Sequence, residues 1–233
     1  MNTLRIERRY HGPPGSGNGG YVSGRLAAFI DGPAVVRLLV PPPLETTMDV
    51  RPVDGGFDLM HGDIRVATVR PTDPVTDVPR VPPYSEVEAA SRGYRGFLWH
   101  PFPTCFVCGP RREPDDGLRI FAGPVGGTSI VAAPWIPHAS LGSRGVVSPE
   151  FVWAALDCPG AFSFESADGT ALLLGEIAAT LTGPVRIGDR HIAVGWEIDR
   201  NGRRHYTRTA IFTESGECLA LARSTWFEVP ATP

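Results

Sequence analysis

The apolar and polar positions in the first third of the chain predict a strand, a helix and then a run of strands. The segment LRIERRY is predicted to be a strand, and a glycine-rich turn leads from it into a helix from about Gly19 to Ile30. Val22, Leu26 and Phe29 recur there at helical spacing. Four strand-like runs follow, separated by proline-rich or glycine-containing turns: AVVRLLV, LETTMDVRP, GFDLMHG and DIRVATVRP.

The same order returns in the second half of the chain. Prolines crowd residues 71–104, which favours an extended connector, and SEVEAASRG is a candidate for a short helix within it. After the connector, GLRIFAG and TSIVAAPW are predicted strands and SPEFVWAALD is a predicted helix. A run of four predicted strands closes the pattern: LLLGEIAATL, RHIAVGWEI, RHYTRTAIF and ECLALARSTWFEV.

Antiparallel strands with one helix in each half predict an α+β fold. In such a fold each of two antiparallel sheets wraps a central helix, and the two sheets can join side by side. Both predicted helices are apolar nearly all round, which suits burial inside a curved sheet. We therefore expect an N-terminal half over residues 1–71, a proline-rich linker over 72–104 and a C-terminal half over 105–233.

Charge and composition narrow the classes of function. The formal net charge is -3 and the basic residues are spread along the chain, so we expect no nucleic-acid partner. The sequence has neither a signal-peptide pattern nor an apolar run of about 18 residues, so we expect no membrane partner and a cytoplasmic location. In that compartment the four cysteines are expected to be reduced.

The two predicted helices carry complementary chemistry. Asn18, Gly19 and Gly20 open the first apolar stretch, and the second carries Asp157 where the first has Ala27, nine positions after each opening residue. Glycine amides at a helix N-terminus can bind a growing negative charge, helped by the helix dipole. If the halves are related and pack as a pair, these amides and the carboxylate would meet in one composite site.

Residues 105–162 resemble a known family. The stretch CFVCGPRREPDDGLRI, followed by GVVSPEFVWAALD, resembles the hotdog-fold acyl-CoA thioesterases of the PaaI-like type. Chains of that type often carry a CxxCG segment, a Gly-Leu pair and a His-Gly-Gly helix start with an acid nine residues after the histidine. Here Asp157 falls on the acid position, and the His-Gly-Gly positions hold Ser148, Pro149 and Glu150.

The first predicted helix shows the opposite departure from the family. There Ala27 replaces the acid, and the positions of the His-Gly-Gly motif hold Asn18, Gly19 and Gly20. In the family the glycine amides come from one chain and the acid from its partner, so the resemblance implies a fused double hotdog with one complete site. The amides of Gly19 or Gly20 would bind the thioester oxygen, and Asp157 would act as general base on water or as nucleophile.

Simpler roles for the same residues stay open. An asparagine before a helix is a common N-cap, and Asp157, followed by Pro159, is also consistent with a helix end that bonds local backbone. The apolar neighbours of Asp157 would raise its pKa, which favours a base near neutral pH. For the phosphates of coenzyme A the candidates are arginines that flank the second helix and a later turn: Arg144, Arg186 and Arg190.

The sequence does not predict a metal or another cofactor. Cys105 and Cys108 form one CxxC without a second pair, and a structural zinc usually needs four ligands, for which His100 and His11 would be the remaining candidates. Cys158 is expected to be a small buried hydrophobe.

The sequence thus predicts an acyl-CoA thioesterase with acyl-CoA as its small-molecule partner. The alternative is a noncatalytic hotdog module that binds acyl-CoA or another apolar ligand, because the second helix has lost the His-Gly-Gly motif. A hotdog dehydratase is less consistent, since neither helix contains a histidine. Pairing within one chain allows a monomer and does not exclude a homo-oligomer.

Overall fold

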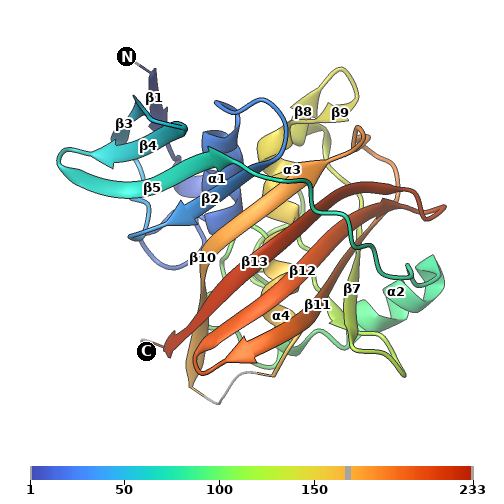
Figure 1. The fold of residues 1–233 in the computed structure, drawn as a ribbon. Coiled ribbons are helices and arrows are strands. Elements are labelled where there is room, and N and C mark those ends of the chain that lie inside the picture. The colour runs from blue at the N-terminus through green and yellow to red at the C-terminus, as the bar shows by residue number, and fades with distance from the viewer. Residues whose placement is uncertain (1, 166–168, 232–233) are drawn as a thin grey trace.

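A computed structural model describes residues 2–165 and 169–231 of the chain (Figure 1). The first part contains one buried helix and five strands. In chain order they are β1 (Asn2–Arg5), α1 (Gly19–Ala27), β2 (Ala34–Leu38), β3 (Thr47–Val53), β4 (Gly56–His61) and β5 (Ile64–Pro71). The connector that follows carries α2 (Tyr84–Arg92), which confirms the short helix expected there and packs against the strands β6 and β7 described next.

The second part repeats this order with longer strands. It begins with β6 (Gly123–Pro124) and β7 (Ile130–Trp135) and passes through a small hairpin of β8 (Gly142–Ser143) and β9 (Val146–Val147). The helices α3 (Pro149–Ala155) and α4 (Cys158–Phe162) come next. The chain then forms β10 (Thr170–Leu181), β11 (His191–Asn201), β12 (Arg204–Thr213) and β13 (Cys218–Pro230).

Eleven of these strands form one antiparallel sheet in the order β1-β3-β4-β5-β2-β10-β13-β12-β11-β7-β6. Leaving β6 aside, the strands run outward from the β2–β10 junction as β2, β5, β4, β3, β1 on one side and as β10, β13, β12, β11, β7 on the other. If the strands of each side are numbered in chain order, both sides have the order second, fifth, fourth, third, first. The junction pairs Ala34 to Arg37 of β2 with Ala179 to Glu176 of β10. The two sheets expected from the sequence are therefore joined into one continuous sheet.

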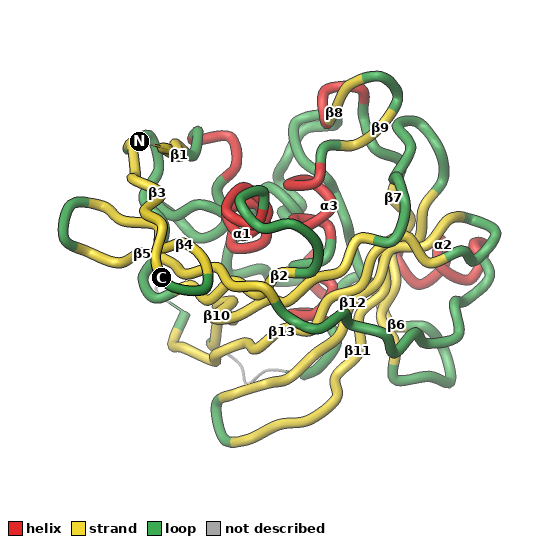
Figure 2. The backbone as a smooth tube through the Cα atoms, turned by 45° about the horizontal axis from the view of Figure 1, so that its top comes forward, coloured by secondary structure: helices red, strands yellow, loops and turns green. Residues whose placement is uncertain are grey.

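The helices α1 and α3 lie side by side on one face of this sheet (Figure 2). Val22 and Leu26 of α1 are fully buried, as are Ala154 and Ala155 of α3, in agreement with the apolar character of both segments. Because glycine lacks a Cβ, its neighbours can approach more closely than they can to any other residue. The helices use this freedom at Gly20 and Gly24, which lie one helical turn apart on the contact face.

Gly24 shows how close the contact is. An added Cβ at Gly24 would lie 2.6 Å from the Cα of Glu150 and 2.7 Å from the Cβ of Trp153. Both distances are below van der Waals contact, so an alanine would force the helices apart. Two glycines of the predicted helix therefore set the spacing between α1 and α3.

Two predicted strands differ from the structure. In LRIERRY the strand ends at Arg5, and residues 8–10 form a turn of 3₁₀ helix. In GLRIFAG the strand prediction is wrong for residues 118–122, because this segment bonds to the turn before it instead of to the sheet. The amide of Leu118 donates to the carbonyl of Phe106, and that of Ile120 to the carbonyl of Val107.

No helix among the described residues is both long and apolar enough to cross a membrane. The longest helices, α1 and α2, each have nine residues.

Candidate functional site

The N-terminus of α1 is capped by Asn18. The side-chain Oδ1 of Asn18 accepts a hydrogen bond from the amide of Tyr21 at 2.9 Å, which is the N-cap expected as the simpler role of this residue. The nitrogen of the same side-chain amide points toward the second half of the chain. Its Nδ2 donates to Oδ2 of Asp157 at 2.8 Å, so the cap residue of one half binds the acid of the other.

Asp157 lies between α3 and α4, and its side chain is 3% exposed. Its Oδ2 accepts a second hydrogen bond, at 2.9 Å, from the amide of Gly20. An added Cβ at Gly20 would lie 2.6 Å from the Cβ of Asp157, so only glycine lets the helix start approach the carboxylate this closely. The structure thus brings together Asn18, Gly20 and Asp157, as the composite site requires.

The two carboxylate oxygens of Asp157 differ in their surroundings. Oδ2 accepts the two hydrogen bonds from Asn18 and Gly20, whereas the buried Oδ1 has no hydrogen-bond donor in the part of the chain that the structure describes. Burial raises the pKa of Asp157 to about 7, and the nearby Cys105 sulfur adds to the rise. The hydrogen bonds from Gly20 and Asn18 act in the opposite direction because they stabilise the charged form.

Gly19 is the first residue of α1, and its amide is free of a protein acceptor within residues 2–165 and 169–231. The first amides of a helix lack intrahelical partners and point toward the space before the helix. An added Cβ at Gly19 would lie 2.9 Å from Cδ2 of Leu174 and 3.1 Å from Cδ1 of Leu38. Glycine therefore leaves room beside this amide where two strands from different halves meet.

A cavity of about 1060 Å³ opens next to these residues. Asn18, Gly19 and Asp157 lie along it, and its walls come from both halves of the chain. Most of the wall is apolar, with side chains from β2, β10, β13 and the segment before Cys105. Its apolar members include Leu38, Leu98, Trp99, Phe102, Phe162, Leu172, Leu174, Trp226 and Phe227.

Three buried cysteines lie along the same cavity or beside it. The Sγ atoms of Cys105, Cys108 and Cys158 lie within 4.8 Å of one another. Hydrogen bonds from the other two thiols hold the pKa of Cys105 well below its usual value. Burial raises the pKa of Cys108 and of Cys158.

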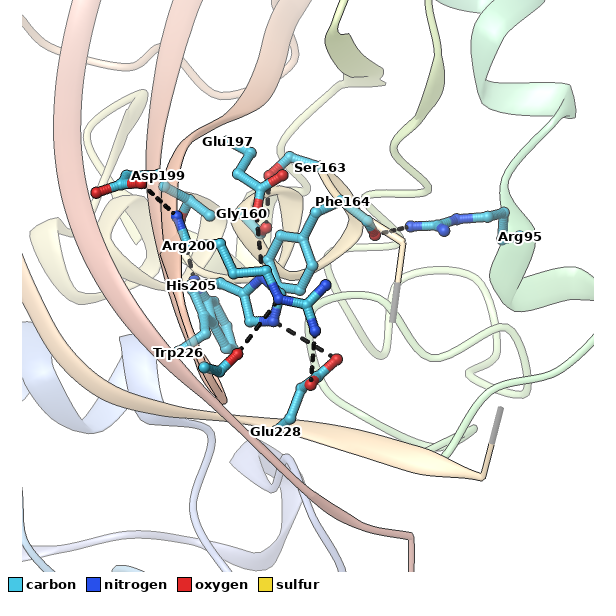
Figure 3. A network of polar contacts seen from close by, with 12 residues as sticks. Arg95, Gly160, Ser163, Phe164, Glu197, Asp199, Arg200, His205, Trp226 and Glu228 are labelled. Atoms are coloured by element: carbon cyan, nitrogen blue, oxygen red, sulfur yellow. Dashed lines mark hydrogen bonds and ion pairs between the residues drawn. The ribbon is translucent and has the colours of Figure 1, made fainter. Parts of the chain in front are cut away.

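Figure 3 shows the polar contacts that fix the far end of α4, the helix that begins directly after Asp157. Arg95 donates to the carbonyl of Phe164, and the ring of Phe164 stacks on His205 with 3.8 Å between ring centroids. His205 is fully buried, and its Nδ1 lies 3.0 Å from Oε1 of Glu197. This network fixes α4 against the sheet and with it the position of the acid at its start.

The three arginines expected to bind coenzyme A do not line the cavity. Arg144 lies in the turn between β8 and β9, and Arg186 forms a β-bridge with Val146 at the same corner. Arg190 pairs with Glu214 at 3.1 Å. Arg186 and Arg190 follow the far end of β10, whereas the residues of β10 that line the cavity, Thr170 and residues 172–176, are at its beginning.

Other arginines lie along the cavity and were missed in the sequence, where nothing distinguishes them. Arg37 pairs with Glu176 at 2.9 Å, and Arg95 is engaged by backbone carbonyls. Arg204 is exposed, and its guanidinium lies 5.6 Å from the ring centroid of Phe227. Arg204 has no carboxylate partner among the described residues, so it is the cationic side chain of the cavity that is free to bind an anion.

Solved structures show which fold this is. The tesB protein of Mycobacterium avium subspecies paratuberculosis is 13% identical, with a TM-score of 0.61 over 98% of this chain and 92% of that one. The acyl-CoA thioesterase II TesB2 from Mycobacterium marinum gives a TM-score of 0.60 at 13% identity, again over 98% of this chain and 92% of its own. The chain has the hotdog-type fold of these thioesterases. No protein-family model and no curated protein matches it.

Proposed function

We propose that the protein is an acyl-CoA thioesterase with one composite site between two hotdog halves. The first half, over residues 1–71, supplies the start of α1, and the second, over residues 105–233, supplies Asp157. In this proposal each half wraps its part of the sheet around its own helix, α1 or α3, and residues 72–104 link them. The likeness to two TesB-type thioesterases supports the proposal at the level of the fold.

One observation carries the proposal: Asp157 is buried beside an apolar cavity, Oδ2 accepts two hydrogen bonds, and Oδ1 has no donor among the residues that the structure describes. A buried carboxylate oxygen that lacks a donor costs free energy, and a donor arriving through the cavity removes that cost. The bonds from Asn18 and Gly20 hold the group in one orientation. These features are those of a positioned base, because a side chain that only ends a helix would bond local backbone.

In the proposed reaction, Oδ1 of Asp157 takes a proton from water as the water oxygen attacks the thioester carbonyl carbon. The carbonyl oxygen becomes negatively charged, and the Gly19 amide, together with the dipole of α1, stabilises that charge. The carbon–sulfur bond then breaks, the thiolate of coenzyme A leaves with the proton from Asp157, and the acyl group departs as a carboxylic acid.

The cavity has side chains suited to both ends of the substrate, the acyl chain and coenzyme A. Leucine, phenylalanine and tryptophan side chains along the wall suit an apolar acyl chain. Arg204 suits the phosphates of coenzyme A, in place of the arginines first expected. The cytoplasmic location predicted from the sequence is consistent with such a substrate and stays a prediction.

The experiment follows loss of the thioester with a panel of short, medium, long and aromatic acyl-CoAs. Asp157→Asn is the test variant because asparagine keeps the shape and an acceptor for the two hydrogen bonds but cannot take a proton. We expect kcat to fall by about 10²–10⁴-fold. Glu150→Gln is the control, since Glu150 is an acid in the first turn of α3 that does not line the cavity.

Hydrolysis that survives in Asp157→Asn would refute the assigned base. If the wild-type protein binds acyl-CoA but leaves every thioester of the panel intact, the protein is a noncatalytic binding module. Circular dichroism of both variants separates a loss of chemistry from a loss of fold.

A further inference from the structure

The cysteine cluster has the composition of a metal site, although its residues are scattered in the sequence. Cys105 and Cys108 come from one turn and Cys158 begins α4, and the three sulfurs lie within 4.8 Å of one another. Sγ of Cys105 is 3.9 Å from Sγ of Cys158. A candidate for a fourth donor is His100, whose Nε2 lies 3.4 Å from Sγ of Cys108 but not within 4.8 Å of all three sulfurs.

Two of these separations match a tetrahedral zinc centre. With Zn–S bonds of about 2.3 Å and a Zn–N bond of about 2.0–2.1 Å, two sulfurs lie about 3.8 Å apart and a sulfur and a nitrogen about 3.6 Å apart. The Cys105–Cys158 and His100–Cys108 distances are each within a few tenths of an ångström of these values. An ion could bind there once His100 moves toward Cys105 and Cys158 and the three sulfurs, now within 4.8 Å of one another, close around it.

The turn that carries two of the sulfurs is already shaped to hold them. The amide of Gly109 donates to the carbonyl of Cys105 at 2.9 Å, and Nδ2 of Asn18 donates to Sγ of Cys105 at 3.9 Å. An added Cβ at Gly109 would lie 2.5 Å from the backbone nitrogen of Cys105, so the turn requires glycine. A hydrogen-bond donor directed at a sulfur stabilises a thiolate, which is the form that binds metal.

We propose that Cys105, Cys108, Cys158 and His100 bind a structural zinc ion. Three thiolates and an imidazole are soft to intermediate ligands that favour zinc over magnesium or calcium. The CxxC lacked a second pair in the sequence, and the fold supplies the third thiolate and the histidine from elsewhere. His11, the other histidine considered there, faces its own turn, with Nδ1 3.2 Å from the carbonyl of Gly12.

The ring of His100 directs Nε2 toward Cys108, and metal binding at Nε2 would cost one hydrogen bond. Its Nδ1 accepts a hydrogen bond from the amide of Phe102 at 2.9 Å, which turns Nε2 toward Cys108. When Nε2 binds a metal, a neutral imidazole carries its proton on Nδ1, so the bond from Phe102 is given up. One neutral hydrogen bond is minor beside the binding free energy of a structural zinc.

Such an ion would join the segment of residues 100–108 to the start of α4. His100, Cys105 and Cys108 precede β6, whereas Cys158 directly follows Asp157. Four protein ligands leave no open position for substrate, so the ion would fix the cavity wall and take no part in the reaction. The site is therefore independent of the proposed hydrolysis, and its test measures bound metal instead of enzymatic activity.

The test is the metal content of untagged protein purified from zinc-supplemented medium, measured by plasma mass spectrometry. We expect about one zinc per chain in the wild type and less than about a tenth of that in Cys108→Ser, which loses one of the four ligands. Cys218→Ser is the matched control, because Cys218 is a free cysteine on β13 outside the cluster, and it should keep its zinc.

A second measurement needs no variant. Wild-type protein stripped with a chelator and titrated with Co²⁺ should show thiolate charge-transfer absorption and the visible bands of a tetrahedral ion, and His100→Ala should alter the visible bands. Wild-type protein without zinc and without these bands would overturn the proposal. So would a metal-free protein in which mass spectrometry finds a Cys105–Cys158 disulfide, or equal zinc loss in Cys108→Ser and Cys218→Ser.

Discussion

Replacing Gly20 or Gly24 by alanine tests whether the contact between α1 and α3 positions the acid. The two additions are equally tight: the new Cβ would lie 2.6 Å from the Cβ of Asp157 at position 20, and 2.6 Å from the Cα of Glu150 at position 24. Each Cβ would also lie 2.7 Å from an atom of Trp153. The variants therefore crowd the same interface, and only Gly20→Ala displaces Asp157 and the amide bound to it.

The expected loss of stability follows from crowding and helix propensity. Overpacking costs about 1–3 kcal/mol, which for a chain of this size lowers Tm by about 2–12 °C. Gly24 lies inside α1, where alanine returns about 1 kcal/mol of helix propensity, so the net cost there is about 0–2 kcal/mol. Gly20 lies in the first turn, where that gain is smaller, so Gly20→Ala should be the less stable of the two.

Activity should separate the variants further. A displacement of the base by about 1 Å costs about 10²-fold in rate, so kcat of Gly20→Ala should fall by that factor while Gly24→Ala stays close to the wild type. Thermal unfolding and initial rates, both taken well below Tm, give the two quantities. Equal activity in the two variants would refute the idea that the start of α1 holds Asp157 in place.

Three further outcomes can be checked. Arg204→Ala should raise KM for acyl-CoA by about 2–5-fold and leave KM for acyl-pantetheine unchanged, since only the former carries the nucleotide phosphates. Leu174→Trp should fill the cavity beside Gly19 and lower kcat/KM for long acyl chains at least about tenfold relative to acetyl-CoA, whereas an equal effect on both would place the acyl chain elsewhere. Burial lowers the pKa of His191, so as the pH drops the unfolded chain binds a proton at this residue before the folded chain does. Protonation therefore favours the unfolded chain, and the free energy of unfolding falls below about pH 6.5. His191→Asn should flatten this fall between about pH 7 and pH 5 in urea unfolding, and replacement of the exposed His61 should not.

The sequence predicted the regular elements well where periodicity and partners are both local. β10 to β13 are long runs, with short turns between β11 and β12 and between β12 and β13, and all four lie where the alternation of apolar residues placed them. In residues 118–122 the alternation is equally clear, and Leu118 and Ile120 are indeed buried. Their hydrogen-bond partners are in the turn at 106–107, which no pattern in the segment itself indicates.

The site was predictable in part for the same reason. The pairing of Asn18 and Gly20 with Asp157 follows once two related halves are assumed to pack as a pair, and the structure brings these residues together. The arginines could not be placed in this way, because a position near a helix in sequence says little about which end of a long strand it faces. The meeting of Cys105 with Cys158 is likewise a property of the packed fold.

The junction between β2 and β10 has a consequence for the order in which the chain is made. β2 pairs with β5 on one side as soon as the first half has formed, but its other edge has no partner until β10 is synthesised. An open strand edge invites pairing with other chains. The nascent first half therefore carries an aggregation hazard that its own second half removes, and expression of residues 1–71 alone should yield aggregated protein.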